Sequence, residues 1–460
     1  MQHLTTVAAA CLFACTAGGA AAQQTQRPAI LSNRWQEDWS ALQSPMLRTQ
    51  PLDRFKYIGL SASDPQRYLS LGANLRIRGE FNSAPGLGAA GQDGDTYLIR
   101  RLETHLDLRL DGFQAFLQLQ DDVAHGKDRT GPADANRLDV EQAFVAWVAP
   151  AGASTFKARV GRQQFAFDLQ RFVSVRDGPN VRQSFDAAWF GYETGTWRFI
   201  GYYSRPVVSQ DARAFDDHSS PALQFNGIRI ERKVLGDNEL SGYWSRYLRQ
   251  DAVFLSAAGN ERRDVWDLRF AGKHGRLDWD AEAMRQHGGV GAQRISAWGI
   301  GTRVGFTAQA RLTPRLGLQL DAASGDRDPH DGRLQTFNPL FPNGAYLALA
   351  GYTGYVNFLH LKPSLTLHPG SRTTLLFAGA AQWRNTTGDA VYLQGSVPLA
   401  GTAGTGKRWT GAYYQVRADV RLAAQLSCAL EAVHFQAGSS LRASGAHDAD
   451  FLGLELRAAW

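Results

Sequence analysis

Basic side chains recur at short spacing in this 460-residue chain, and their types indicate reversible contact with anions rather than a reaction. Arginine keeps its charge at any working pH and presents a planar fork that fits a carboxylate. Each such contact in water is worth about 1 kcal/mol at about 4 Å. Several contacts in series would recruit a polyanion without holding it in place. The recurring pairs are Arg76 and Arg78, Arg101 and Arg109, Lys157 and Arg159, and Arg417 and Arg421.

For any one of these residues the alternative is an ion pair with an acidic residue on the next strand, since such pairs are common and weak in water. The polar faces that carry them nevertheless contain more Arg and Lys than Asp and Glu. A wall with a surplus of guanidinium groups attracts anions and repels cations. The sequence therefore predicts an anion-attracting surface, with pairing left open for each residue.

The basic pairs lie on segments whose polarity alternates with a period of two, which is typical of β-strands. In YLSLGANLRIRGEF (68–81), the apolar residues from Leu69 onward share one face, and Arg76 and Arg78 share the other. The same alternation returns in RRLETHLDLRLD (100–111), TFKARVG (155–161), GIRIERK (227–233), VWDLRFAGK (265–273), LDWDAEA (277–283), YQVRADVRLA (414–423) and the final FLGLELRAAW (451–460).

Two architectures produce such strands. A soluble sandwich buries its apolar face in a core, whereas a transmembrane barrel turns that face to lipid and its polar face to a lumen. Charges of both signs on the polar faces, and Trp460 at the end of an alternating strand, favour the barrel over a secreted all-β protein. An Arg facing lipid near the midplane costs about 2–4 kcal/mol, so the leucines should face outward. The strand-edge aromatics expected at the membrane interfaces are Tyr68, Phe81, Tyr97, Trp147, Trp197, Tyr202, Tyr203, Trp383, Tyr413 and Tyr414.

The chain divides into three parts. Residues 1–22 resemble a secretory signal peptide, with an apolar run that ends in small residues. Residues 23–67 form an irregular lead-in, and 68–460 form the barrel. At roughly 24 residues per strand and connection, this length predicts about 16 to 18 strands and an aqueous channel. We also expect a loop inside the lumen, drawn from the long Gly-rich connections.

The lead-in and first strand, NRWQEDWSALQSPMLRTQPLDRFKYIGL and YLSLGANLRIRGEF, resemble the opening segment of the alginate export family of outer-membrane barrels. ARVGRQQFAFDLQRFVSVRDGPNVRQSFDAA and SGDRDP…FNPLFPNGAYL resemble two later blocks of the same family. The resemblance covers most of the chain beyond the signal segment. It implies a monomeric barrel, with 18 strands the preferred number, and an arginine-rich constriction that passes an anionic polysaccharide.

The resemblance also implies roles for individual residues, as constriction or loop-anchoring groups. These are Lys56, Arg76, Arg159, Arg162, Asp168 and Arg171, while Asn180, Arg182 and Asp186 belong to the same block and are expected to fix a loop. Together with the recurring pairs, the predicted pore-lining set is Lys56, Arg76, Arg78, Arg101, Arg109, Lys157, Arg159, Arg162, Asp168, Arg171, Arg417 and Arg421.

Other sequence motifs give weaker evidence of function. GTAGTGKR (401–408) is one residue from a phosphate-binding loop, but Arg408 stands where Ser or Thr should bind magnesium. Asp326, Asp328 and Asp331 leave a loop-bound calcium ion as a weak alternative to the expectation of no cofactor and no metal. We find no nucleophile elbow and no Ser-His-Asp arrangement, so we predict no catalytic residues and no enzyme.

The sequence thus predicts an outer-membrane channel of a Gram-negative cell, reached after signal cleavage, for passive and anion-selective passage of an acidic, alginate-like exopolysaccharide. The alternative is a general porin for uptake of small anions or carboxylates. A barrel hydrolase is a third and weaker hypothesis. The expected partners are the anionic polysaccharide, outer-membrane lipid and periplasmic polymer-export proteins. A net charge of +6, spread along the chain, gives no reason to expect nucleic acid.

Overall fold

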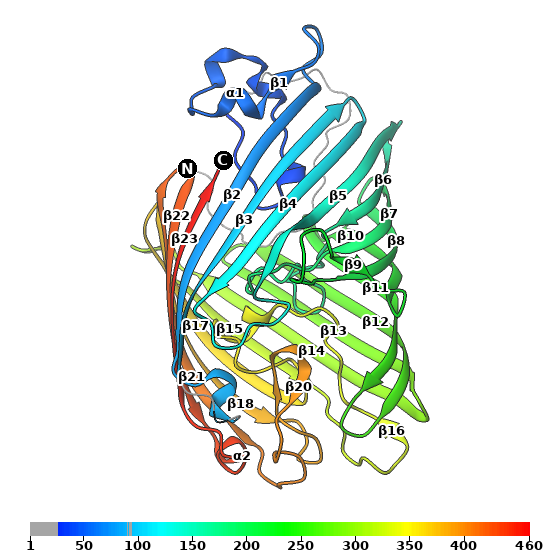
Figure 1. Ribbon diagram of the computed structural model, residues 1–460, viewed down its shortest axis with the longest axis vertical. Coiled ribbons are helices and arrows are strands. Elements are labelled where there is room, and N and C mark those ends of the chain that lie inside the picture. The colour runs from blue at the N-terminus through cyan, green and yellow to red at the C-terminus, as the bar shows by residue number, and fades with distance from the viewer. Residues whose placement is uncertain (1–25, 90, 92–93) are drawn as a thin grey trace.

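The computed structural model describes residues 26–460 except 90, 92 and 93. The predicted signal segment lies outside these residues. The described chain forms a closed antiparallel barrel of 18 strands (Figure 1). These strands are β2 (Arg67–Asn82), β3 (Asp95–Leu110), β4 (Phe113–His125), β5 (Asn136–Ala151), β6 (Ser154–Gln163), β7 (Phe185–Thr194), β8 (Trp197–Val208), β10 (Leu223–Val234), β11 (Asn238–Val253), β12 (Ala258–His274), β13 (Leu277–Val290), β14 (Gln293–Thr307), β15 (Arg315–Ala323), β17 (Phe358–Gly370), β18 (Thr373–Arg384), β21 (Trp409–Ala423), β22 (Leu426–Ala437) and β23 (Ala449–Ala459).

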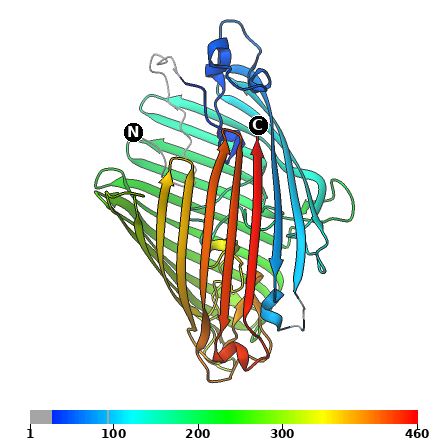
Figure 2. The ribbon, with the colours of Figure 1, turned by 90° about the vertical axis from the view of Figure 1, so that its left-hand side faces the viewer.

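The barrel closes where the last strand pairs with the first, β23 with β2, which lie side by side in Figure 2. In this register Arg76 lies opposite Arg457 on one neighbour and Arg101 on the other. Closure pairs both edges of the sheet, so no strand is left with unsatisfied backbone groups in lipid. The fold class is therefore as predicted, including the preferred strand number.

The remaining elements are short. They are β1 (Ile58–Gly59), β9 (His218–Ser219), β16 (Arg333–Leu334), β19 (Tyr392–Leu393), β20 (Val397–Pro398), α1 (Asp53–Lys56), α2 (Ser439–Arg442), and the 3₁₀ turns η1 (Arg34–Gln36), η2 (Ser40–Gln43), η3 (Pro45–Leu47), η4 (Pro85–Gly88), η5 (Gly344–Tyr346) and η6 (Gln394–Ser396). Among the described residues no helix is long and apolar enough to cross a membrane.

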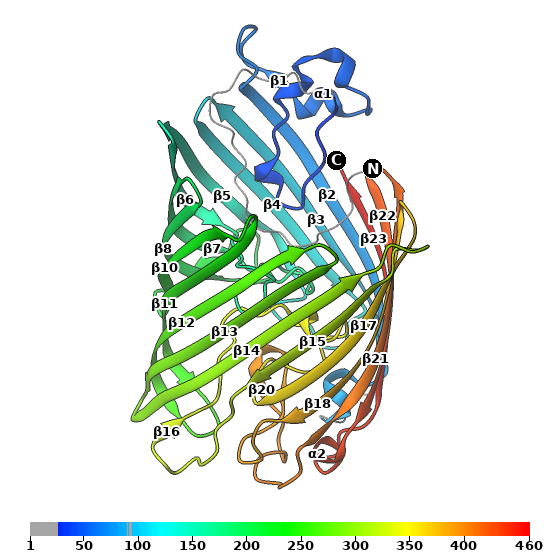
Figure 3. The same ribbon diagram turned by 180° about the vertical axis from the view of Figure 1, so that it is seen from behind.

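The two ends of the barrel differ in their connections. Tight turns such as 111–112, 275–276 and 424–425 lie at the end that also holds α1 and the C-terminus, which we call the short-turn end (Figures 1 and 3). Longer connections such as 385–408 and 438–448 lie at the opposite, long-loop end. This asymmetry is typical of bacterial outer-membrane barrels, whose short turns face the periplasm.

The outward face is apolar along the strands, as the alternation predicts. Side chains such as Val145, Trp266 and Leu454 are 61%, 57% and 58% exposed, while the neighbouring Arg76 and Arg78 on β2 are buried inside. A belt of exposed aliphatic and aromatic groups of this extent is not stable in water, so it requires lipid. The prediction that leucines face outward and arginines inward is confirmed.

The predicted aromatic girdles are only partly correct. Phe81, Trp147, Trp197, Tyr203, Trp383 and Tyr414 lie on the outward parity of their strands. By contrast, Tyr68, Tyr202 and Tyr413 are at most 5% exposed and face the interior, and Tyr97 donates to Glu80 inside the barrel. Position at a strand edge does not fix which face a residue occupies; the parity of the strand does.

Candidate functional site

A cavity of about 2020 Å³ lies along one side of the barrel interior. Its walls are the inward faces of β2, β3 and β21 to β23, the tip of the 164–184 loop and part of the 324–357 loop. It is bordered by residues 27–33 and Arg372 at the short-turn end, and it reaches Lys127 of the β4–β5 connection. We call this space the lumenal cavity.

The other side of the interior is filled by an aromatic cluster. Inward residues of β7, β8 and β10 to β14, the wall that faces the viewer in Figure 3, pack against the 164–184 and 324–357 loops. Phe165 stacks on Phe185 with ring centroids 4.2 Å apart, and Phe341 contacts Phe225 edge-on at 5.4 Å. Such packing fixes both loops inside the barrel. The lumenal cavity lies mainly toward the side where β23 meets β2.

Two predicted arginines anchor the tip of the 164–184 loop through its backbone. Arg76 donates to the carbonyls of residues 177, 178 and 179 at 2.9–3.1 Å. Arg101 donates from Nε to the Asn180 carbonyl at 2.6 Å and from Nη2 to the Pro179 carbonyl at 2.5 Å. These guanidinium groups therefore act as donors to a folded-in loop. This loop contains a single glycine, Gly178, whereas the 324–357 loop, also fixed inside the barrel, contains five, so the expectation of a Gly-rich plug describes the second loop and not the first.

Asp177 is the ionic centre of this tip. Its carboxylate accepts from Arg101 Nη1 at 2.7 Å, Arg182 Nη2 at 2.7 Å and Arg457 Nη2 at 3.1 Å. Burial alone would raise the pKa of Asp177, but Arg457, Arg182 and Arg101 hold this pKa well below its usual range. The carboxylate is therefore charged at any working pH, and it ties the loop to β3 through Arg101 and to β23 through Arg457, while Arg182 belongs to the loop itself.

The rest of this wall is a ladder of alternating charges. Glu455 accepts from Arg76 Nε at 2.7 Å, and Glu431 accepts from Arg78 Nη2 at 2.7 Å. Arg417 contacts both Glu431 and Asp419. The pairing that the sequence left open is thus realised at Arg76, Arg78, Arg101 and Arg417. Each of these arginines lines the lumenal cavity with an acidic neighbour.

Arg421 differs from them. It also lines the cavity, but it is exposed at the short-turn end, beside Arg372. The Arg421 backbone N–H donates to the Arg372 carbonyl at 2.8 Å. Neither side chain makes an ion pair or hydrogen bond within the described part of the chain. These two cations form an unpaired rim at the cavity mouth.

Four further predicted residues lie away from the cavity. Arg109 pairs with Asp107, and Lys157 pairs with Glu193 at 2.8 Å. Arg162 pairs with Asp186 at 2.9 Å, and the Arg159 guanidinium lies 4.3 Å from the centre of the Trp35 ring. Strand parity correctly turns Arg109, Lys157 and Arg159 from lipid, whereas Arg162 shares the outward parity of Val160 and is covered by the connection that carries Asp217. It does not reveal that this part of the interior is packed.

Asp168 and Arg171 are buried in the filled half. Arg171 is fully buried and contacts Glu282, Asp280 at 3.3 Å and the Tyr346 hydroxyl at 2.6 Å. Asp168 accepts from Arg229 Nη2 at 2.6 Å and pairs with Arg269 at 2.9 Å. Both residues therefore join the 164–184 loop to the wall of β10, β12 and β13. Of the two roles that the resemblance implied, constriction or loop anchoring, this is the second.

Lys56 lies in the lead-in, which folds across the short-turn end. Arg34 donates to Asn74 Oδ1 and to the Trp460 carbonyl, each at 2.7 Å, and so fastens this segment to the end of the barrel. Lys56 Nζ is sealed between the rings of Trp39 and Trp460, 5.4 Å from each centre. Burial and the nearby Arg34 charge lower the pKa of Lys56 to about 7.

Several residues of the cavity were not predicted as pore-lining. Arg182 and Arg457 complete the tip contacts, and Asp177, Glu431 and Glu455 supply the negative half of the ladder. Glu431 and Glu455 could have been predicted from the sequence, because both occupy the inward parity of their strands. The role of Asp177 depends on how the loop folds back, which no local pattern specifies.

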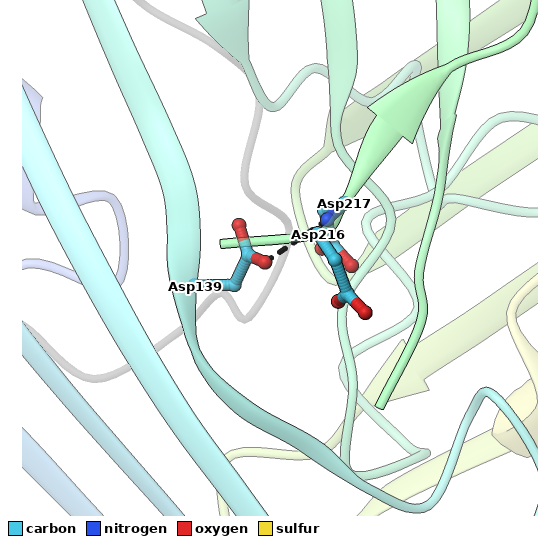
Figure 4. A group of neighbouring side chains, drawn as sticks. All are labelled: Asp139, Asp216 and Asp217. Atoms are coloured by element: carbon cyan, nitrogen blue, oxygen red, sulfur yellow. Dashed lines mark hydrogen bonds between the residues drawn. The ribbon is translucent and has the colours of Figure 1, made fainter. Parts of the chain in front are cut away.

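The acidic motif at 326–331 does not gather its carboxylates. Asp326 accepts from Ser256 Oγ at 2.5 Å, and Asp328 and Asp331 accept from backbone N–H groups of their own turn. Among the described residues, carboxylate oxygens converge instead in two other groups. One is Asp168, Asp267 and Glu282 inside the barrel, and the other is Asp139, Asp216 and Asp217 (Figure 4).

Comparison with solved structures finds barrels of the same fold in Pseudomonas aeruginosa. OpdO matches with a TM-score of 0.55 at 13% identity, over 85% of this chain and 97% of that one. OccK2 (OpdF), solved in complex with glucuronate, matches with a TM-score of 0.53 at 15% identity, and OccK5 (OpdH) matches with a TM-score of 0.51 at 14% identity. Both matches again cover 85% of this chain and 97% of the other chain. No curated protein matches the sequence.

The profile of the alginate export family matches residues 67–455, which is most of the chain and nearly all of the barrel. Its fold and its family are those of channels and not of enzymes. The chain therefore belongs to the alginate export family and is an outer-membrane β-barrel channel.

Proposed function

We propose that this channel passes an acidic polysaccharide by anion-selective diffusion along the lumenal cavity. The observation that carries the proposal is the charge of the cavity lining, which holds twelve Arg and Lys side chains against seven Asp and Glu. A surplus of this sign, in a narrow space with low-dielectric walls, concentrates anions and excludes cations. We assign the anion selectivity to the excess of positive charge in the lining as a whole, because most of the individual arginines are paired with acidic residues.

Pairing also suits movement of a polymer. A carboxylate that approaches Arg78 or Arg417 must compete with Glu431, which already accepts from both guanidinium groups. Each new contact is consequently weak, and a chain with many carboxylates exchanges one contact for the next along the ladder. A volume of about 2020 Å³ exceeds the roughly 300–1,000 Å³ of pockets for single small ligands, which favours an extended substrate.

The order of the cations supports entry from the periplasm. With the short-turn end on that side, an arriving polymer meets the exposed Arg372 and Arg421 first and then the paired ladder. The alternative, a porin for small carboxylates, is favoured by the shared fold with OccK2 (OpdF), a protein solved with glucuronate. The two functions differ in whether a chain of uronates enters the cavity.

Recording from planar bilayers tests the proposal. The reversal potential in a salt gradient should show anion selectivity, and a soluble polyuronate should block the current reversibly, whereas a neutral dextran of matched length should not. A cation-selective or unselective channel would overturn the proposal. Selective conduction of glucuronate without block by the polymer would replace it with the porin function.

A further inference from the structure

Three carboxylates meet outside the lumenal cavity, where the β8–β10 connection (209–222) returns to the start of β5. Asp139 belongs to β5, and Asp216 and Asp217 belong to the connection; their ligand oxygens all lie within 4.8 Å of one another (Figure 4). Asp139 is 1% exposed, and the other two are partly buried. Like charges at this separation repel strongly where water is excluded.

Nearby cations do not neutralise the group. Arg162 Nη1 lies 3.7 Å from Asp139 Oδ1, but its guanidinium is held by Asp186 at 2.9 and 3.3 Å and donates to the Asp217 carbonyl. The other contacts are single neutral donors: Val140 N and Asp217 N to Asp139, Arg213 N to Asp216, and Gln210 N to Asp217.

A buried amide beside the group independently indicates a missing ligand. Asn136 is 0% exposed, and its Nδ2 donates to Asp217 Oδ2 at 2.7 Å, so its side chain is directed into the cluster. Its Oδ1 is sealed from solvent and has no hydrogen-bond donor among the described residues, and the same is true of Asp216 Oδ1. Buried oxygen atoms without donors are rare unless water or an ion satisfies them.

We propose that Asp139, Asp216, Asp217 and Asn136 form a calcium site that fastens the 209–222 connection to β5. Carboxylate and amide oxygens are the ligands that Ca²⁺ takes, in irregular geometry and with several oxygens per ion. Mg²⁺ demands a near-ideal octahedron and gives up water reluctantly, so this asymmetric set favours Ca²⁺. The site is separate from the cavity lining and does not depend on the proposed transport function.

Trypsin cleavage of the purified full-length barrel tests the site, because Arg213 is exposed within the connection. Cleavage after Arg213 is compared in Ca²⁺, Mg²⁺ and chelator, with cleavage after Lys233, which is exposed near the end of β10 beside its tight turn to β11, as the internal reference. Extracellular calcium modules have Kd values of about 10⁻⁴–10⁻³ M. With about 10 mM Ca²⁺, about 10 to 100 times such a Kd, cleavage should slow about 10- to 100-fold relative to the reference.

Variants locate the effect. Asp216→Asn should abolish the response to Ca²⁺, whereas Asp211→Asn, in the same connection but bonded to Arg137, should keep it. Titration calorimetry of the unaltered protein should give one Ca²⁺ per chain, which keeps the test decisive if a variant does not fold. No protection by Ca²⁺, equal protection by Mg²⁺, or an unchanged response in Asp216→Asn would each overturn the proposal.

Discussion

Replacing Asp177 by Asn removes the ionic centre of the inward loop while keeping its shape. The side chain loses charge-assisted hydrogen bonds to Arg101 and Arg182, which are 3% and 14% exposed, and one to Arg457, which is 40% exposed. Charged hydrogen bonds are about twice as strong as neutral ones, so the two sheltered pairs lose about 1 kcal/mol each. The solvent-screened pair loses about 0.5 kcal/mol.

Only the bonds to Arg101 on β3 and Arg457 on β23 join the loop to the wall, because Arg182 belongs to the loop itself. The seated position of the loop tip should therefore weaken by about 1.5 kcal/mol, a factor of about 10 in its equilibrium with unseated states. The backbone bonds from Arg76 and Arg101 to residues 177–180 do not depend on the Asp177 charge. They should keep the loop inside the barrel for most of the time. We expect briefer closed intervals and noisier single-channel currents, together with stronger anion selectivity, because the lining loses one negative charge.

Single-channel recording in a salt gradient measures both effects. Asp419→Asn is the matched control, since Asp419 also lines the cavity and its side chain bonds Arg417 and not the loop. That control should shift the reversal potential without added noise. If Asp177→Asn leaves gating unchanged, or if both variants add the same noise, the assignment of Asp177 as the anchor of the loop is refuted.

Three further changes test other parts of the channel. Arg372→Glu combined with Arg421→Glu should move the reversal potential toward cations, most strongly at low salt, and an unchanged potential would contradict their place at the mouth. The pKa of Lys56 is about 7 when the lead-in is docked on the barrel and 10.5 in an ordinary lysine. Between pH 7 and 10.5 the undocked lead-in therefore binds more protons than the docked one. Docking should strengthen by up to about 1.4 kcal/mol per pH unit above pH 7, read as amide protection of residues 34–56, and Lys56→Met should remove this slope. Leu454→Arg, on the outward face, should destabilise the barrel in lipid vesicles by about 2–4 kcal/mol relative to Leu454→Ala in urea unfolding, and no difference would argue against a lipid-facing β23.

The alternation of polarity predicted the architecture because one physical cost dominates it. A slip of one residue would move Arg76 and Arg78 together into lipid, so the parity of β2 can be read directly from its sequence. The same reasoning placed Leu454 outside and Arg417 inside. It failed for the aromatic residues at strand edges, because Tyr68 and Tyr413 are as stable in a packed interior as at a membrane interface.

The candidate site was predictable only in part. Inward parity identifies which side chains avoid lipid, but it does not separate the cavity side from the side filled by loops. Arg229 on β10 and Arg76 on β2 both occupy the inward parity of alternating strands, yet Arg229 is buried against Phe167 of the aromatic cluster and Arg76 lines open space. That division depends on where residues 164–184 and 324–357 fold back, through contacts between residues far apart in the chain.

Flux through reconstituted vesicles tests the central claim most directly, because it follows the polymer itself. Vesicles loaded with a fluorescent oligouronate and a neutral oligosaccharide of equal length, in separate colours, report both fluxes in one sample. Preferential release of the oligouronate, reduced by Arg372→Glu with Arg421→Glu, is the predicted result. Equal release of the two oligomers, or retention of the oligouronate, would contradict it.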